Sequence, residues 1–169
     1  MRKSFFAVLL AFITLSASAQ SMKNIDKTPL NKEADFKTAE PKVKEAAEYL
    51  LSHPVDIKDE SSLAASRFLI LWMTGTPDYS FGVDGDMVKF VEKNTALTGV
   101  FMAAMVKVAL DKPELAKDAK KFKIASYKVF ADYCANDAHK VEKTVSIKSL
   151  IEANKKGKVE SVLDMSQVK

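Results

Sequence analysis

Residues 113–135, PELAKDAKKFKIASYKVFADYCA, decide the fold class of this chain. The positions of one face recur with the period of an α-helix, and they are Leu115, Ala119, Phe122, Ser126, Val129, Phe130 and Tyr133. Lys117, Lys121 and Lys128 fall on the opposite face, which is typical of the solvated side of a surface helix. An anionic lipid or polysaccharide is the alternative partner for this lysine row. The stretch predicts an amphipathic helix.

The rest of the chain carries the same helical period and no sustained alternation of period two. Five further helices are expected at residues 41–52, 60–74, 86–93, 96–110 and 139–155. Pro41 fits a first helical position, Asp59 an N-cap, and Gly75 and Gly157 helix stops. The small Gly99 would let a second helix approach closely.

The predicted fold is all-α, with about six helices arranged as three antiparallel hairpins. The hairpins form either an irregular bundle or a short array like the tetratricopeptide and HEAT repeats, although the residues carry no repeat signature. Residues 20–38 are polar and lysine-rich and are expected as a flexible leader. Residues 39–163 are expected to form a single helical domain, and residues 164–169 a frayed tail.

Residues 1–19 have the layout of a secretory signal peptide. Arg2 and Lys3 form a basic head, an apolar run covers residues 5–15, and Ala17 and Ala19 are small residues of a cleavage site. The prediction is an exported protein, periplasmic or secreted, that is soluble after cleavage near Ala19/Gln20. No later apolar run is long enough for a transmembrane segment.

Charge and cysteine content restrict the classes of function. The chain carries 26 basic and 22 acidic side chains, and two of the basic ones lie in the predicted signal peptide, so the net charge of the remainder is +2. This near-neutral balance, with Arg67 the single arginine outside that peptide, argues against nucleic-acid binding. Cys134 is the only cysteine, which excludes an internal disulfide. It is interpreted as a buried hydrophobic residue, with an intermolecular disulfide or a reactive thiol as the alternative.

The helix at 60–74 is apolar on all sides and is therefore expected at the centre of the domain. Leu63, Ile70 and Leu71 lie on one side of it, and Phe68 and Trp72 project from the other. Arg67 shares the first of these sides. It is expected to be partly buried and paired with an acidic or carbonyl partner, with substrate binding as the alternative.

The loop over residues 75–86, GTPDYSFGVDGD, is the longest non-helical connection inside the domain. Asp78, Asp84 and Asp86 could offer oxygen ligands to Ca²⁺, but their spacing does not match a calcium loop. The simpler interpretation is a turn followed by an aspartate cap of the next helix. Tyr79 and Phe81 are expected to fold back on the core as a lid.

No residues of the sequence form a catalytic constellation, and no cofactor is expected. His53 and His139 both lie at helix edges, and a thiol–imidazole pair of Cys134 with His139 lacks a third orienting group. The prediction is a protein that is not an enzyme.

Three segments carry a resemblance: FLILWMTGTPDYSF at residues 68–81, ADYC at 131–134 and LIEAN at 150–154. They resemble an uncharacterised family of small bacterial exported all-helical proteins. The resemblance implies the helical fold and export, and it implies no activity.

Two hypotheses of function remain. The first is a non-enzymatic protein-interaction or scaffold module whose partner is another envelope or secreted protein, with the oligomeric state left open. The alternative is a small-ligand or metal-binding protein, or a weak enzyme, that uses the loop at 75–86. A ligand site there would include Arg67, Trp72, Asp78, Tyr79 and Phe81, and a metal site Asp78, Asp84 and Asp86.

Overall fold

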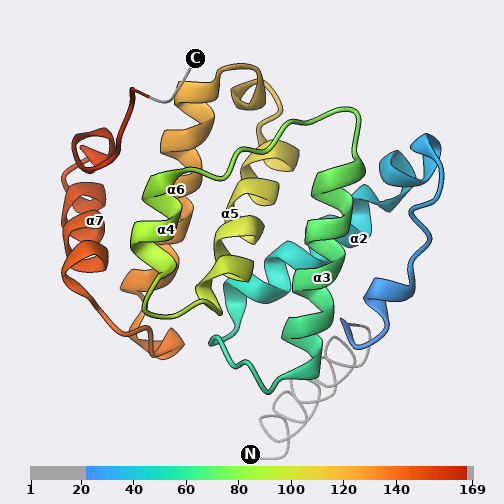
Figure 1. The fold of residues 1–169 in the computed structure, drawn as a ribbon, viewed down its shortest axis with the longest axis horizontal. Coiled ribbons are helices and arrows are strands. Elements are labelled where there is room, and N and C mark those ends of the chain that lie inside the picture. The colour runs from blue at the N-terminus through green and yellow to red at the C-terminus, as the bar shows by residue number, and fades with distance from the viewer. Residues whose placement is uncertain (1–21, 167–169) are drawn as a thin grey trace, which may run out of the picture.

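The computed structural model describes residues 22–166, and this part of the chain contains helices and no strands (Figure 1). Its α-helices are α2 (Glu33–Ser52), α3 (Glu60–Gly75), α4 (Gly85–Val91), α5 (Leu97–Asp111), α6 (Ala119–Ala135) and α7 (Val145–Lys155). Short 3-10 turns precede, join or follow them: η1 (Ile25–Lys27), η2 (Leu115–Lys117), η3 (Asp137–His139) and η4 (Val159–Val162). The all-α prediction is confirmed, and α2 packs with α3, α4 with α5 and α6 with α7. The predicted signal peptide lies outside the described residues.

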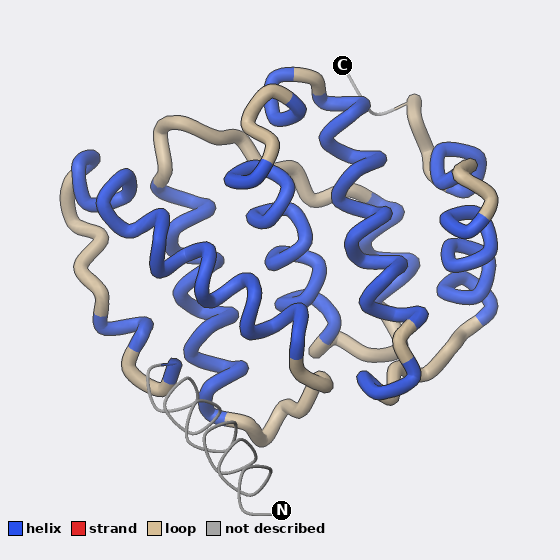
Figure 2. The backbone as a smooth tube through the Cα atoms, turned by 180° about the vertical axis from the view of Figure 1, so that it is seen from behind, coloured by secondary structure: helices blue, strands red, loops and turns tan. Residues whose placement is uncertain are grey.

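The central helix is α5, which packs against α2, α3, α4 and α6. Figure 1 shows it between α3 and α6, and the reverse view in Figure 2 shows α2 running diagonally across this layer. The prediction that α3 would be central is wrong. One side of α3 is buried through Phe68 and Trp72, whereas Leu63, Ile70 and Leu71 remain 42%, 42% and 54% exposed.

The N-terminal part differs most from the prediction, because α2 begins at Glu33 and Pro41 lies inside it. The carboxylate of Asp35 accepts hydrogen bonds from the backbone N–H groups of Asn31 and Lys32, which stabilises a helix start ahead of the proline. Residues 22–38 are therefore not a flexible leader. They contain η1 and the first turns of α2, and the side chain of Met22 is fully buried.

The other helix boundaries follow from capping residues. Asp59 caps α3 as predicted, accepting from the N–H groups of Ser61 and Ser62. Asp118 accepts from the N–H of Lys121, so α6 begins at Ala119 rather than at residue 113. Thr144 caps α7 in the same way, which moves its start from residue 139 to Val145. Gly157 has a φ of 67°, as expected of a residue that ends a helix.

Two buried clusters form the core and meet at α5. One lies between α2, α3 and one side of α5, and the other between α4, the opposite side of α5, α6 and α7. Tyr79 and Phe81 of the connection between α3 and α4 pack against both clusters. None of the helices within residues 22–166 combines the length and the apolar character that a membrane span requires.

Candidate functional site

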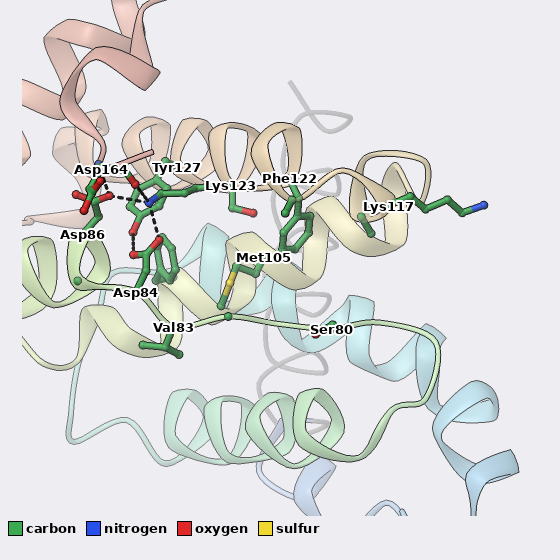
Figure 3. Close-up of a pocket in the computed structure, with 16 residues that line it drawn as sticks. Ser80, Val83, Asp84, Asp86, Met105, Lys117, Phe122, Lys123, Tyr127 and Asp164 are labelled. Carbon is green, nitrogen blue, oxygen red and sulfur yellow. Dashed lines mark hydrogen bonds and ion pairs between the residues drawn. The ribbon is translucent and has the colours of Figure 1, made fainter. Parts of the chain in front are cut away.

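A pocket of about 940 Å³ opens where the connection before α4 passes α5 and the first half of α6 (Figure 3). Its wall has an apolar part that includes Val83, Phe101, Met105, Ala116 and Phe122. Its other part is polar and includes Asp84, Asp86, Lys123, Ser126, Tyr127 and Asp164. The pocket therefore offers apolar contacts and hydrogen-bonding groups to one occupant, which is the usual composition of a small-molecule site.

Lys123 is the centre of the polar part. Its Nζ lies 2.8 Å from Asp84 Oδ2, 2.8 Å from Asp86 Oδ2 and 2.6 Å from the backbone carbonyl oxygen of Asp164. Lys123 and Asp86 are both 7% exposed, so this ion pair is nearly removed from water. Buried charges of this kind are stable only when paired and hydrogen-bonded, which is the case here.

Further hydrogen bonds tie this group to its surroundings. The hydroxyl of Tyr127 donates to Asp84 Oδ1 at 2.7 Å, and the N–H of Met87 donates to the same oxygen at 3.0 Å. The N–H of Asp164 donates to Asp86 Oδ2 at 2.7 Å. Lys123 thus joins α6 to the start of α4 and to the residues after η4. Residue 164 belongs to the packed structure and not to a frayed tail.

The protonation states of this group follow from its contacts. Burial alone would raise the pKa of Asp84, but hydrogen bonds from Lys123, from the Met87 N–H and from Tyr127 outweigh it and hold that pKa below its usual value. Burial acts to lower the pKa of Lys123, and the two carboxylates beside it reverse the effect and raise that pKa. Burial raises the pKa of Tyr127 strongly, so its phenol keeps the proton. Asp84 and Lys123 are therefore both charged at neutral pH.

Local sequence places these groups. Asp84 is the N-cap of α4, as the simpler interpretation of the loop expects, and Asp86 lies in the first turn of that helix. Lys123, Tyr127 and Phe130 are spaced i, i+4, i+7 on α6 and share one side of it. Because Tyr127 and Phe130 are fully buried, Lys123 is carried into the interior with them.

Ser126 is the unsatisfied group of the pocket wall. It is 1% exposed, and it is the one buried side chain among residues 22–166 whose oxygen or nitrogen has no hydrogen-bond partner. Buried hydroxyls normally have a partner, because leaving one unpaired costs about 1–3 kcal/mol. Ser126 belongs to the wall of the pocket, but its hydroxyl oxygen is shielded from solvent.

The predicted lid is confirmed as packing. The ring centroids of Tyr79 and Phe81 lie 5.7 and 5.9 Å from that of Trp72, and Phe81 also lies 6.0 Å from Phe122 of α6. Trp72 is fully buried, and its indole N–H donates to the backbone carbonyl of Phe36 at 2.9 Å. These three aromatic residues lie next to the pocket but do not form its wall.

The remaining predicted site residues are dispersed. Arg67 is exposed and pairs with Asp26 at 3.0 Å, so the acidic partner is confirmed and the partial burial is wrong. Asp78 lies 3.5 Å from Lys37 of α2, whereas Asp84 and Asp86 both bind Lys123. Within the described residues no three His, Cys, Asp or Glu side chains are grouped as a metal ion would require. The three aspartates of the hypothetical metal site therefore do not share one site.

Sequence reasoning missed Lys123, Ser126 and Tyr127. The helical period signalled the burial of Tyr127, because Cys134 and Ala131 flank it on the wheel. It did not show which acidic residues would meet Lys123, since Asp86 is 37 positions away in the chain. Only the folded structure shows that the Ser126 hydroxyl has no hydrogen-bond partner.

Cys134 lies outside this pocket and is fully buried, as predicted. Burial raises the pKa of its thiol to about 12. His139 stacks on Tyr133 with ring centroids 4.0 Å apart, and its Nδ1 is hydrogen-bonded with the Tyr133 carbonyl. The burial of Cys134 and the contacts of His139 with Tyr133 give Cys134 and His139 structural roles.

Comparisons with protein-family models, with curated proteins and with solved structures found no significant match to this chain. The resemblance to small exported helical proteins therefore stays a prediction.

Proposed function

We propose that this protein binds a small amphipathic molecule in the pocket between α4, α5 and α6. The observation that carries the proposal is the mixed wall of this pocket, in which an apolar part meets a polar part. The polar end of an occupant would lie beside Asp84, and its apolar part would contact Met105 and Phe122. This is the small-ligand hypothesis, moved from Arg67 and Trp72 to the pocket beside Lys123.

The polar groups of the pocket favour binding over catalysis. Lys123 is held by two carboxylates and a carbonyl, so it is not a free base or nucleophile. Ser126 has no hydrogen-bond partner at all, and therefore no base that would activate its hydroxyl. The proposed role is reversible binding without chemical conversion.

The proposal is tested by blocking the pocket at its rim. Ala119 lines the pocket at the first position of α6, and Ala135 is an exposed residue at the last position of the same helix. A fragment library is screened by ¹H–¹⁵N NMR against the unsubstituted protein, Ala119→Phe and Ala135→Phe. We expect hits that shift the amide signals of Val83, Met105 and Ser126, that are lost in Ala119→Phe and that persist in Ala135→Phe. Fragments that bind Ala119→Phe as well as they bind the unsubstituted protein, or a complete absence of hits, would contradict the proposal.

A second candidate function is protein docking on α3, as in the interaction-module hypothesis. Leu63, Ile70 and Leu71 form an exposed apolar face on this helix, and Ile57 beside it is 66% exposed. Apolar groups gathered in this way are typical of interaction surfaces. The test places a photo-crosslinking residue at Leu71 and, as a control, at Val145, which is 87% exposed on α7. A specific adduct from position 71 alone would support this function, and equal yields from both positions would contradict it.

A further inference from the structure

We propose that the partner that docks on α3 is a second copy of this chain, related to the first by a two-fold axis, with the two α3 helices antiparallel. This inference rests on the second candidate function, because it names the partner of the same apolar face, and it does not depend on the pocket. Three features support it: an exposed stripe along α3, two opposite charges within that stripe, and exposed apolar groups placed in the same register.

The exposed side of α3 has the spacing of a helix that pairs with another helix. Its exposed residues recur at intervals of three and four positions, and they are Glu60, Leu63, Arg67, Ile70 and Thr74, with Leu71 beside them. Side chains at such intervals form one continuous line along a helix, which is the line that a second helix contacts. Nothing among residues 22–166 covers this stripe, so only another molecule can bury it.

The two charged residues of α3, Glu60 and Arg67, have opposite signs, and both lie in the stripe. In a two-fold pair, every contact between two different residues occurs twice with the roles exchanged. An antiparallel pair that places Glu60 of one copy beside Arg67 of the other therefore forms two ion pairs at once. A parallel two-fold pair would place each charge opposite its own kind, which is repulsive. The charges thus favour a second copy and select the antiparallel arrangement.

Both side chains can make this contact without losing their partners in their own chain. Arg67 Nη2 donates to Asp26 Oδ2 at 3.0 Å, and Lys23 Nζ lies 3.1 Å from Glu60 Oε2. A guanidinium has five N–H donors and a carboxylate has a second oxygen, so each group can accept a further partner. The side chains of Arg67 and Glu60 are both more than half exposed, so a second copy can reach them. The four side chains together carry no net charge, so two copies of a chain with a net charge of +4 would meet at a neutral surface.

The exposed apolar groups fit the same register. Pairing Glu60 with Arg67 puts the midpoint of the two helices between residues 63 and 64, so Leu63 of one copy meets Leu63 of the other. Ile70 of each copy is then level with residue 57 of the other, and Ile57 is 66% exposed. Ile57, Leu63 and Ile70 line one groove between α3 and the start of α5, so they lie on the same side of the stripe. The arrangement that joins the charges therefore also joins these apolar side chains.

The test is an exchange of the two charges. Sedimentation equilibrium measures self-association of the full chain for the unsubstituted protein, for Glu60→Arg, for Arg67→Glu and for an equimolar mixture of the two variants. In either variant alone both contacts join like charges, so we expect the dissociation constant of the dimer to rise at least about tenfold. In the mixture each contact joins opposite charges again, so we expect a mixed dimer whose dissociation constant lies within about threefold of the unsubstituted value.

Glu152 and Lys155 of α7 provide the matched control, because they form an exposed ion pair away from α3, with Nζ 3.1 Å from Oε1. Glu152→Arg and Lys155→Glu should each leave the dissociation constant unchanged. Circular dichroism checks that all four variants fold, which we expect because exposed ion pairs contribute little to stability.

Three results would overturn the inference: an unsubstituted protein that is monomeric at about 1 mM, association that Glu60→Arg and Arg67→Glu do not weaken, or a mixture that associates no more tightly than its separate variants. Photo-crosslinking from position 71 separates these results from a failure of the docking function. An adduct with twice the mass of the chain would support the second copy. A specific adduct with a different protein would overturn the second copy and leave docking on α3 in place, and the absence of any specific adduct would overturn both.

Discussion

The ammonium of Lys123 and the carboxylate of Asp86 lie 2.8 Å apart, and both side chains are 7% exposed. Lys123 comes from α6 and Asp86 from α4, and the two residues are separated by 37 positions in the chain. Asp84 and the backbone of Asp164 complete the group around the ammonium. The pocket, the start of α4 and the residues after η4 therefore depend on one buried lysine.

Replacing that lysine should destabilise the protein strongly. Lys123→Met keeps the length of the side chain and leaves Asp86 as a buried carboxylate without its counter-ion. Loss of one member of a buried pair costs about 3–5 kcal/mol. Urea unfolding followed by circular dichroism measures the change. Lys128→Met, an exposed position of the same helix, is the control and should stay within about 0.5 kcal/mol. A loss of similar size in both variants would refute the role assigned to the network.

The same network predicts how stability depends on pH. The folded pKa of Asp84 is depressed below 3.8, so its contribution is present above pH 3.8 and is lost as pH falls through the folded pKa. The folded pKa of Lys123 is raised above 10.5, so its contribution is present below pH 10.5 and is lost as pH rises through the folded pKa. The free energy of unfolding should therefore decline at both extremes. Measured from pH 2 to 12, the decline at each end should be shallower in Lys123→Met, and an unaltered profile in that variant would contradict the assignment.

Gly75 should be needed for the packing of Phe36 rather than for a special backbone angle. A Cβ at this position would come within 2.2 Å of the Phe36 ring. We expect Gly75→Ala to cost about 1–3 kcal/mol of unfolding free energy, because the ring must move. In the background of Phe36→Ala the same substitution should cost much less, which a double-mutant cycle measures. Gly82→Ala, where a Cβ would meet nothing within 4 Å, is the control. Additive costs in the cycle would show that the ring is not the cause.

Cys134 should react slowly while the protein is folded. Its thiol is fully buried, and burial raises its pKa to about 12, so little thiolate exists at pH 8. Iodoacetamide labelling at pH 8, followed by mass spectrometry, should leave the native protein largely unmodified and modify it fully in denaturant. Rapid labelling of the native protein would support the reactive-thiol alternative instead.

Local patterns predicted most of the fold, because helices depend on periodicity and capping residues that lie close together in the chain. Asp59 and Gly157 were read correctly for that reason. The start of α2 was missed because Pro41 suits a first helical position, yet it is tolerated inside this helix once Asp35 stabilises an earlier start.

Long-range pairing is what the sequence could not provide. The apolar residues of α3 were all assigned to the core, but Leu71 is exposed because α5 and α2 cover only the opposite side of that helix. Long-range pairing also forms the candidate site. The sequence singles out Asp84 and Asp86 as acidic residues of a loop, whereas the structure shows that both carboxylates pair with Lys123 of α6.

The tie between Asp164 and the Lys123–Asp86 pair has a consequence for how the chain folds during synthesis. The N–H of Asp164 meets a side chain 78 residues earlier, and its carbonyl meets one 41 residues earlier. A nascent chain that has reached α6 already holds Lys123 and Asp86, but it cannot complete their burial until residue 164 has left the ribosome. The pocket thus closes only after residue 164 has emerged, and the helices built before it remain until then an unfinished assembly on which chaperones can act.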